Sequence, residues 1–524
     1  MTGCITNDLP YPVVVPNITS MEVEGAEKVN IDYDKRVVTV HMKEEVDLRA
    51  VSVLSVTIDQ EVAKPSVSLV GVHDLTSPLK FNIRTYDDYN WTIVAVKDIE
   101  RYFTVKGQIG TSVIDAANRR AIATVGGKVN VAEVEVTSLK LGPAGVSKYS
   151  MELSQMKDFT HGLSVDVTSF DETQTWTLYV EVSEISVQIK DINAWTYDAY
   201  VTANGEAGKT NSFQYREKGT EQWIDVNPSD ITSDGGSFVA HITGLKAETT
   251  YEAVAVSGSD RTEAEEFTTD PATPLPNHSF ENISLVTGKD YYKWYDPASS
   301  DPDGSYMFWG SGDGEGPDGV NGSANLGIVL TTPERIDVPD GSICVKCSSS
   351  SFAGMLTSGN LFTGQFMGIV GTSGGKLNYG RPWTTRPKSL KLKLKYNCGL
   401  VDIVGTYPPG EVINVGDNDR CNVIVSVGDW DYRTYGGTKE SPVHVNTTEK
   451  KFFTSDSEGI IGYGEFVLGE STDGWIEVEI PIEYRSLTRK PTHIIITCAT
   501  SMRGDYFTGS SKSVLWLDDF DLIY

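Results

Sequence analysis

Apolar and polar residues alternate in short runs along most of the chain, and helical periodicity is scarce. The clearest run is the last one, SVLWLDDFDLIY (residues 513–524), in which apolar and aromatic side chains surround two adjacent carboxylates, Asp518 and Asp519. Runs of this length and composition predict β-strands. Carboxylates inside such a strand need a partner, because desolvation of an unpaired charge costs free energy. We therefore expect a β-sandwich domain in which a cation, an arginine or a strand edge lies beside these two residues.

The first third of the chain contains a repeat. The segment IDYDKR (residues 31–36) recurs as IDAANR (residues 114–119), and alternating valines and leucines follow both copies at the same spacing. A tryptophan lies on the last strand expected in each copy, at Trp91 and Trp176. Repeats of about 80 residues have the size of small immunoglobulin-like sandwiches. We predict two such modules that act as spacers, over residues 24–103 and 104–184.

Residues 185–270 resemble a fibronectin type III domain. Trp195 lies where that family has a core tryptophan on its second strand, and Leu245, Thr249 and Tyr251 have its L-x3-T-x-Y spacing. The resemblance implies a third sandwich, in which Tyr251 buries its ring and its hydroxyl bonds to the backbone upstream. The usual role of such a module is spacing or contact with other proteins.

A proline-rich linker, residues 271–276, separates this module from the rest of the chain. The remaining residues, 277–524, are too many for another immunoglobulin-like unit and suit a large jelly roll with long loops. The predicted fold class is therefore all-β: tandem immunoglobulin-like and fibronectin III sandwiches followed by a large β-jelly-roll.

Six blocks of this C-terminal region resemble a known family in order and spacing. The blocks are N-x-x-F-E (277–281), W-G-S-G (309–312, where the family has Asn in place of Gly310), N-L-x-T-G (360–364), G-R-P-W-x-x-R-P (380–387, continuing to Lys395 and Tyr396), G-D-x-F-x-G (504–509) and the closing D-D-x-x-L-I-Y (518–524). They are similar to the putative carbohydrate metabolism domain of surface lipoproteins from gut Bacteroidetes. The resemblance implies a jelly roll and a glycan-related role.

Composition and the motifs found in the sequence limit the partners and the kinds of site that this protein could have. A formal net charge of −28 argues against a nucleic-acid partner and favours a soluble, self-repelling surface. The sequence holds seven histidines and no H-E-x-x-H, P-loop or plausible G-x-S-x-G motif. Six cysteines form no disulfide framework, and the C-x-x-C of Cys344 and Cys347 lacks the second pair or histidine that zinc would need. We interpret these two cysteines as structural.

The N-terminus is similar to the end of a bacterial lipobox, because Thr-Gly precedes Cys4. We expect residues 1–23 to form a lipoprotein tether in which Cys4 is acylated, so that the lipid anchor alone holds the protein at a membrane. This predicts a cell-envelope location, as an outer-membrane lipoprotein exposed at the surface or in the periplasm. The alternative is a free cysteine in a flexible tail.

Aromatic, arginine and carboxylate residues gather in the blocks of the C-terminal region. Sugars stack their C–H faces on aromatic rings, while guanidinium and carboxylate groups bind hydroxyls or an acidic group. The predicted glycan-binding residues are Trp309, Tyr379, Arg381, Trp383, Lys395 and Asp505. The alternatives are tryptophans that plug the ends of the sandwich, a salt bridge between Arg381 and Asp505 that locks a loop, and a solvated strand face for Lys395.

Three carboxylates could hold a structural calcium ion. Glu281 lies on the first strand expected in the jelly roll, and Asp518 and Asp519 lie on the last. A calcium ion bound by carboxylates and carbonyls could clamp these strands together. Alternatively, hydrogen bonds from backbone amides would satisfy the carboxylate oxygens equally well.

These observations predict a cell-surface lipoprotein that binds a poly- or oligosaccharide through its jelly roll, in glycan capture or utilisation, with other surface proteins as candidate partners. One alternative is a glycoside hydrolase or polysaccharide lyase, although no carboxylate pair at the required separation can be chosen from the sequence. The other is a structural or adhesion protein. We favour binding over catalysis.

Overall fold

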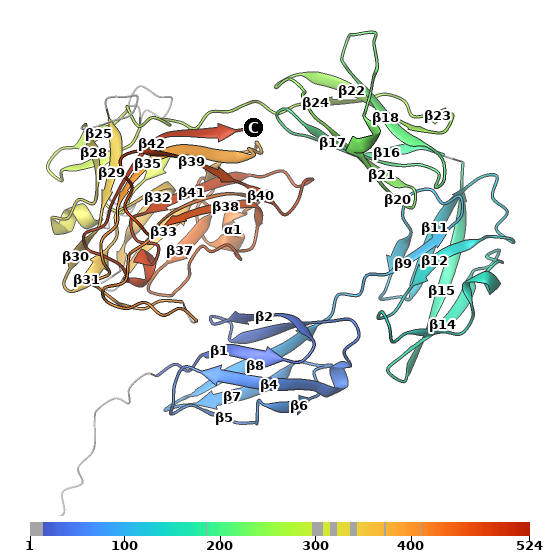
Figure 1. Cartoon of the computed structure of the whole chain (residues 1–524), viewed down its shortest axis with the longest axis horizontal. Coiled ribbons are helices and arrows are strands. Elements are labelled where there is room, and N and C mark those ends of the chain that lie inside the picture. The colour runs from blue at the N-terminus through green and yellow to red at the C-terminus, as the bar shows by residue number, and fades with distance from the viewer. Residues whose placement is uncertain are drawn as a thin grey trace, which may run out of the picture.

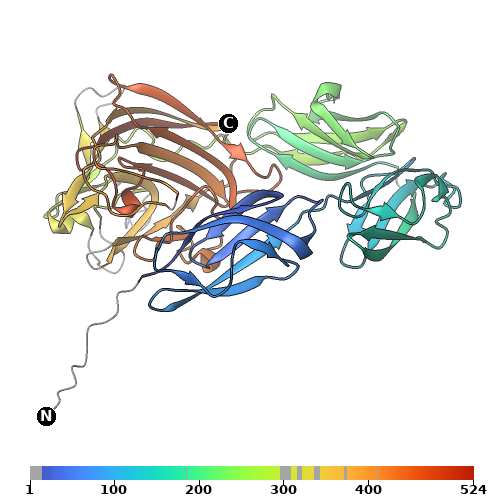
Figure 2. The ribbon, with the colours of Figure 1, turned by 60° about the horizontal axis from the view of Figure 1, so that its bottom comes forward.

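The computed structural model describes residues 14–524, except 185, 296–307, 315–321, 336–342, 371–373 and 409. Strands dominate this part of the chain, as predicted, and its only α-helix is α1 (Tyr432–Tyr435). None of its helices is long and apolar enough to span a membrane. Its 3-10 helices are η1 (Leu48–Ala50), η2 (Leu153–Gln155), η3 (Pro228–Asp230), η4 (Ser323–Leu326) and η5 (Gly504–Tyr506). Four β-domains follow one another around an arc that brings the first domain back beside the last (Figure 1, Figure 2).

The first domain is a sandwich of two sheets, with strand orders β1-β4-β6 and β2-β3-β8-β7-β5. The strands are β1 (Ile18–Val23), β2 (Ala26–Asp32), β3 (Val37–Met42), β4 (Val51–Ile58), β5 (Lys64–Pro65), β6 (Gly71–His73), β7 (Leu79–Arg84) and β8 (Asp88–Val96). Their apolar faces meet around the buried Trp91. The boundary expected for the tether, residues 1–23, is wrong, because β1 already pairs with β4 of the sandwich. Cys4 lies outside the described residues.

The second domain repeats the plan of the first, as the repeat in the sequence predicts. Its sheets have the orders β10-β11-β15-β14-β13 and β12-β9. The strands are β9 (Tyr102–Val105), β10 (Val113–Asp115), β11 (Arg120–Gly126), β12 (Val136–Lys140), β13 (Lys148–Tyr149), β14 (Leu163–Ser169) and β15 (Glu172–Ser183). The boundary expected between residues 103 and 104 falls inside β9, which pairs with β12 and so belongs to this domain.

The two copies share both topology and turns. β3 pairs in parallel with β8, and β11 with β15 in the same way. Trp176 is buried in the second core as Trp91 is in the first. Arg36 and Arg119 both adopt left-handed backbone angles, with φ of 53° and 55°. The repeated arginines therefore mark equivalent turns before a strand.

The third domain has the two-sheet plan that its resemblance to fibronectin type III implies. The sheets are β16-β17-β21-β20 and β19-β18-β22-β23, with β24 paired to β22. The strands are β16 (Gln188–Ala194), β17 (Ala199–Asn204), β18 (Asn211–Glu217), β19 (Ile224–Asp225), β20 (Ile231–Asp234), β21 (Ser237–Ile242), β22 (Thr250–Ser257), β23 (Asp260–Arg261) and β24 (Glu265–Thr268). Tyr251 is buried, and its hydroxyl accepts the amide N–H of Lys246 at 2.9 Å, as the tyrosine corner predicts.

The C-terminal domain packs a nine-stranded sheet against a five-stranded one. The larger sheet has the order β37-β33-β32-β41-β36-β38-β40, with β27 paired to β32 and β34 to β41; the smaller has the order β28-β29-β42-β35-β39. Two hairpins, β25-β26 and β30-β31, flank them. This two-sheet architecture agrees with the predicted jelly roll.

The strands of this domain alternate between the core and the opposite face of each sheet. They are β25 (Ser284–Val286), β26 (Tyr291–Lys293), β27 (Trp309–Gly310), β28 (Thr331–Glu334), β29 (Cys344–Ser348), β30 (Ser350–Phe352), β31 (Met355–Thr357), β32 (Asn360–Val370), β33 (Gly374–Tyr379), β34 (Arg381–Pro382), β35 (Ser389–Asn397), β36 (Cys421–Gly428), β37 (Val443–Asn446), β38 (Ile460–Leu468), β39 (Ile476–Pro481), β40 (Glu483–Tyr484), β41 (His493–Ala499) and β42 (Val514–Ile523). On β36, Val423 and Val425 enter the core between the sheets. Asn422 and Ile424, one residue out of phase, face the other side. All eight residues of β36 are nevertheless buried, so other parts of the chain cover that second face as well.

The cysteines of this domain are structural, as interpreted from the sequence. Cys344 and Cys347 lie buried on β29 as free thiols. Burial, with a smaller contribution from Asp518, raises the pKa of the Cys344 thiol to about 12. A thiol with so high a pKa is protonated at neutral pH and is a poor nucleophile or metal ligand.

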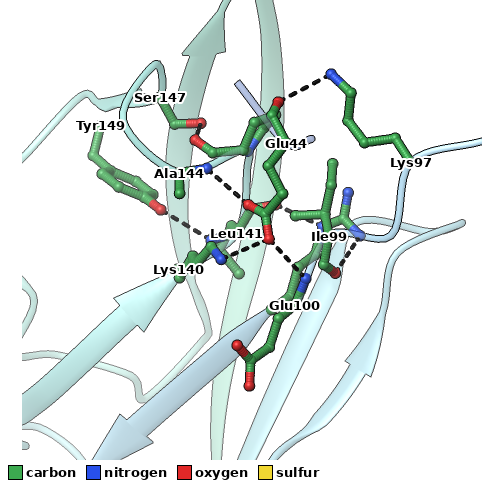
Figure 3. Close-up of polar contacts among 11 residues, drawn as sticks. Glu44, Lys97, Ile99, Glu100, Lys140, Leu141, Ala144, Ser147 and Tyr149 are labelled. Carbon is green, nitrogen blue, oxygen red and sulfur yellow. Dashed lines mark hydrogen bonds and ion pairs between the residues drawn. The ribbon is translucent and has the colours of Figure 1, made fainter. Parts of the chain in front are cut away.

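The first two domains meet at a polar joint around Glu44, which lies after β3 (Figure 3). One carboxylate oxygen of Glu44 accepts a bond from Lys140 Nζ at 2.9 Å and the other from the Ala144 amide at 2.8 Å. The amide of Glu100, in the connection between the domains, also donates to Glu44, at 3.3 Å. The carboxylate therefore links both domains and the segment that joins them.

The third domain is docked on the C-terminal domain. Arg386 is 3% exposed, lies 4.9 Å from the ring of Trp195 and donates to the Ala194 carbonyl at 2.5 Å. Lys490 pairs with Asp270 at 2.8 Å across the same contact. The core position implied for Trp195 is therefore wrong: its ring packs against Tyr484 of the C-terminal domain, with ring centres 4.6 Å apart.

Candidate functional site

A cleft of about 990 Å³ lies on the face of the nine-stranded sheet that points away from the core. Residues two apart on neighbouring strands share this face because strand side chains alternate. The floor consists of Phe362, Phe366, Leu377, Tyr379, Asn422, Ile424, Tyr463, Glu465 and Thr497. Segments 352–358, 452–456 and 501–507 rise around it. The cleft is thus a sheet surface enclosed by loops.

Asp505, on η5, brings a carboxylate into the cleft. Part of the residue is exposed, while burial of its carboxyl among the loops around the cleft raises its pKa to about 6. Tyr379, on β33, lies beside it: burial chiefly, and then the charge of Asp505, hold the pKa of the Tyr379 phenol well above its usual range. This edge of the cleft can therefore donate and accept hydrogen bonds.

Glu465, on β38, supplies a second carboxylate from the floor. Asn422 Nδ2 donates to one of its oxygens at 3.1 Å, and the hydroxyl of Tyr463 donates to the other at 3.0 Å. These bonds fix the orientation of the carboxylate while the residue stays exposed. Glu465 can therefore accept further hydrogen bonds from a bound molecule.

Aromatic rings line the side of the cleft between these acids. Phe452 and Tyr506 face each other across two loops with ring centres 4.4 Å apart, and both are half-buried. The ring of Tyr379 packs against Phe362 on the floor and Phe453 on the wall, with ring centres 5.3 Å and 6.5 Å apart. The lining therefore combines apolar ring faces with a few oriented polar groups, the usual composition of a small-molecule site.

Two of the six predicted glycan-binding residues, Tyr379 and Asp505, line this cleft. Trp309 does not: it is fully buried, donates to the Pro276 carbonyl at 2.7 Å, and packs against Phe280 and Phe520. Trp383 is also buried in the same core. The assignment of both tryptophans to a glycan site is therefore corrected, because neither ring face is accessible, and the alternative of plugging the sandwich agrees with their positions.

Arg381 is corrected as well, and so is its proposed pairing with Asp505. Its guanidinium is buried and donates to the carbonyls of Phe308 and Gly364 and to the hydroxyl of Ser441, at 3.2, 2.6 and 2.6 Å. It locks loops together through backbone carbonyls. Lys395 lies on β35, in the other sheet, with its Nζ 5.1 Å from the centre of the Trp516 ring. Neither residue lines the cleft.

Glu465, Tyr463, Phe452, Tyr506 and Arg503 line the cleft as well and were not predicted from the sequence. The two-residue spacing of Tyr463 and Glu465 within an apolar run was a signal that they share one strand face. The remaining three come from a loop and from the short η5 segment, whose meeting place cannot be obtained from periodicity.

The carboxylates predicted to bind calcium lie near one another but have other partners. Asp518 accepts the Asp519 amide at 2.9 Å, Glu281 accepts the Ile343 amide at 3.0 Å, and Asp519 pairs with Lys393 at 3.1 Å. Within the part of the chain that the structure describes, no group of three or more His, Cys, Asp or Glu side chains could hold a metal ion. Backbone amides bond to Asp518 and Glu281, whereas the other carboxylate oxygen of Asp518 is buried without a hydrogen bond, and the calcium site stays a prediction.

Comparisons with solved structures find distant similarities. A putative glycoside hydrolase from Bacteroides thetaiotaomicron is 16% identical, with 81% of this chain and 95% of that chain covered and a TM-score of 0.31. A putative glycoside hydrolase from Bacteroides vulgatus is 20% identical over 47% and 96% of the chains, with a TM-score of 0.33. The surface glycan-binding protein PbSGBP-B from Prevotella bryantii is 10% identical over 69% and 81%, with a TM-score of 0.22. These similarities are too weak to indicate an activity.

No protein of curated function matches the sequence. A family profile does match, over residues 279–523, and it describes the putative carbohydrate metabolism domain. The matched residues span the two packed sheets, the core around Trp309 and the cleft with Asp505 and Glu465. Residues 279–523 of this chain therefore match the putative carbohydrate metabolism domain family, which is a carbohydrate-associated family by its description.

Proposed function

We propose that the protein binds carbohydrate in the cleft of its C-terminal domain, as a cell-surface lipoprotein of glycan capture or utilisation. The observation that carries the proposal is the cleft itself, because it combines aromatic rings and two accessible carboxylates in a domain of a carbohydrate-associated family. Its volume of about 990 Å³ is at the upper end of the range of ligand sites, roughly 300–1,000 Å³, and suits an oligosaccharide.

The lining supports specific roles for its residues. Phe452 and Tyr506 pack on each other, and because both are only half-buried, the C–H faces of a sugar can stack on the surface that this pair leaves exposed. Asp505 and Glu465 accept hydrogen bonds from sugar hydroxyls, and such bonds to a charged group are stronger than neutral ones. The oriented polar groups in the cleft favour this proposal over an adhesion protein, for which an apolar patch or an unpaired edge strand would be expected.

Substitution of Asp505 tests the site. In the full chain, Asp505→Asn should weaken binding of a glycan selected on an array about 10- to 100-fold, since a hydrogen bond to a charged group contributes roughly 1.5–3 kcal/mol. Isothermal titration calorimetry measures the change. Asp473→Asn, which removes a carboxylate on an exposed loop outside the cleft, is the matched control and should bind normally. Equal affinities for the two variants would place the binding site elsewhere.

A second candidate function is glycoside hydrolysis in the same cleft. The raised pKa of Asp505, about 6, is suited to a general acid, and Glu465 is a second carboxylate in the same space. Release of reducing ends from the bound glycan, lost in Asp505→Asn and in Glu465→Gln, would establish this activity. Tight binding without any release by the unmodified protein would exclude it for that glycan.

The lipid anchor is a separate part of the proposal and rests on the Thr-Gly-Cys sequence that ends at Cys4. Acylation would tie the first domain to a membrane and leave the other domains in solution. In bacteria fed labelled palmitate, the secreted protein should incorporate the label and Cys4→Ser should not. Equal labelling, or none in either protein, would contradict the anchor.

A further inference from the structure

We propose that the cleft selects neutral oligosaccharides and excludes glycans that carry carboxylate or sulfate groups. This inference rests on the proposed function and names the class of ligand for the same cleft. It differs from the expectation drawn from the sequence, in which an arginine could bind an acidic sugar, because Arg381 lies in the core.

The charged groups around the cleft are mostly acids. Asp456, Glu465 and Asp505 line it, from the wall, the floor and η5 respectively, and all three are exposed. Arg503 is the one cationic residue among the described lining residues, which include no lysine or histidine. A ligand in the cleft therefore meets three carboxylates and one guanidinium from the described lining residues, and a second guanidinium, that of Arg485, lies beside the wall, where it donates to the Ser455 carbonyl.

The guanidinium of Arg503 already has a carboxylate partner. Its Nε donates to Glu411 at 2.9 Å, and a second nitrogen donates to the other oxygen of the same carboxylate. This paired geometry is the strong form of an arginine–carboxylate contact. Arg503 lowers the pKa of the Glu411 carboxyl in return. Its charge is compensated before any ligand arrives.

The turn after β2 in the first domain brings charges of both signs near this region. Asp34, in that turn, lies close enough to Tyr506 to contribute to the raised pKa of that phenol, after burial, Asp505 and Glu411 and against the effect of Arg503. Lys450, in the loop beside the cleft, is near enough to Asp34 to lower the pKa of its carboxyl against the larger effects of burial and Asp32. The charge of Lys450, and that of Lys35, which pairs with Asp32 at 3.3 Å, therefore both have acids beside them.

These charges discriminate between ligands. Sugar hydroxyls donate hydrogen bonds to carboxylates, so a neutral glycan satisfies Glu465 and Asp505 without a change in charge. An anionic glycan would bring a like charge into an enclosed space, where water screens the repulsion less than in bulk. We expect at least about tenfold weaker binding for an acidic derivative of a neutral ligand.

The test uses the full chain and pairs of ligands that differ only in charge. An array carrying neutral, carboxylated and sulfated oligosaccharides identifies a neutral ligand, whose C6 hydroxymethyl groups are then oxidised to carboxylates. Calorimetry should give a dissociation constant at least tenfold higher for the oxidised form. Raising the salt concentration should narrow that ratio, because ions screen the repulsion.

Variants assign the effect to the cleft. Asp456→Asn combined with Glu465→Gln should reduce the ratio of the two dissociation constants several-fold, whereas Asp473→Asn should leave it unchanged. Equal or tighter binding of acidic glycans by the unmodified protein would overturn the inference and keep the proposed function. Failure of every glycan class to bind would instead overturn the proposed function. The salt dependence needs no variant and holds even if the double substitution fails to fold.

Discussion

Trp309→Ala is expected to lower the unfolding free energy of the C-terminal domain by about 3–5 kcal/mol. The side chain is fully buried, with ring centres 5.3 Å from Phe280 and 5.4 Å from Phe520. Its removal leaves a cavity in the core and deprives the Pro276 carbonyl of its donor at 2.7 Å. Calorimetry of the full chain should show the transition of this domain lowered on the order of 10 °C.

The matched control is Trp516→Ala, on the same pair of sheets. Trp516 is half-buried on the outer face of β42, where Lys346 and Lys395 lie 5.8 Å and 5.1 Å from its ring centre. Loss of such exposed contacts should cost only about 1 kcal/mol. Equal losses in the two variants, or a Trp309 variant that keeps its stability and loses only glycan binding, would contradict the core assignment.

Asp518→Asn should stabilise the C-terminal domain increasingly as pH rises from 5 to 8. Burial chiefly, then the charges of Asp519 and Glu281, raise the pKa of Asp518 to about 7, although Lys393 opposes them. In the unfolded chain this carboxyl has a pKa of about 3.9. Between these values the folded state binds a proton that the unfolded state does not, so stability falls as pH rises.

The size of this effect follows from the difference in pKa. The two pKa values differ by about three units, so the stability gained by Asp518→Asn should reach at most about 4 kcal/mol at pH 8. The gain should vanish near pH 4. Asparagine keeps the acceptor oxygen for the Asp519 amide and cannot ionise. Urea unfolding at a series of pH values measures the difference, with Asp473→Asn as control. Parallel pH profiles for Asp518→Asn and the unmodified protein would show that the buried carboxyl titrates normally.

Much of the architecture could be predicted from local patterns. Alternating runs, the repeat of residues 31–36 at 114–119 and the spacing around Tyr251 identify sandwiches because strand periodicity and turn residues are short-range properties. The same patterns do not predict where a domain begins. Residues 18–23 belong to the first domain because they pair with β4, a strand that lies elsewhere in the sequence, and local patterns do not show that pairing.

The candidate site could be predicted only in part, for a reason that its residues illustrate. Asp505 lies in a block that resembles the family and Tyr379 directly before one, but Arg381 and Trp383 also lie in such a block and do not line the cleft. Residue type does not tell a side chain that fills a core from one that lines a cleft. Glu465 lies outside these blocks and reaches the cleft only because β38 neighbours β36.

Within its ten residues, the last strand, β42, shows both what the local sequence determines and what only the tertiary structure decides. Its sequence alone determines an extended, largely apolar strand, but strict alternation would place Phe520 on the same face as Trp516. The chain instead bulges at Asp519, where φ is 50° and the register with β35 shifts, so that Phe520 joins Leu517 in the core while Trp516 stays outside. Side-chain alternation is a local property, whereas the bulge, the enclosed cleft and the docking of Arg386 on Trp195 arise from packing between segments far apart in the chain.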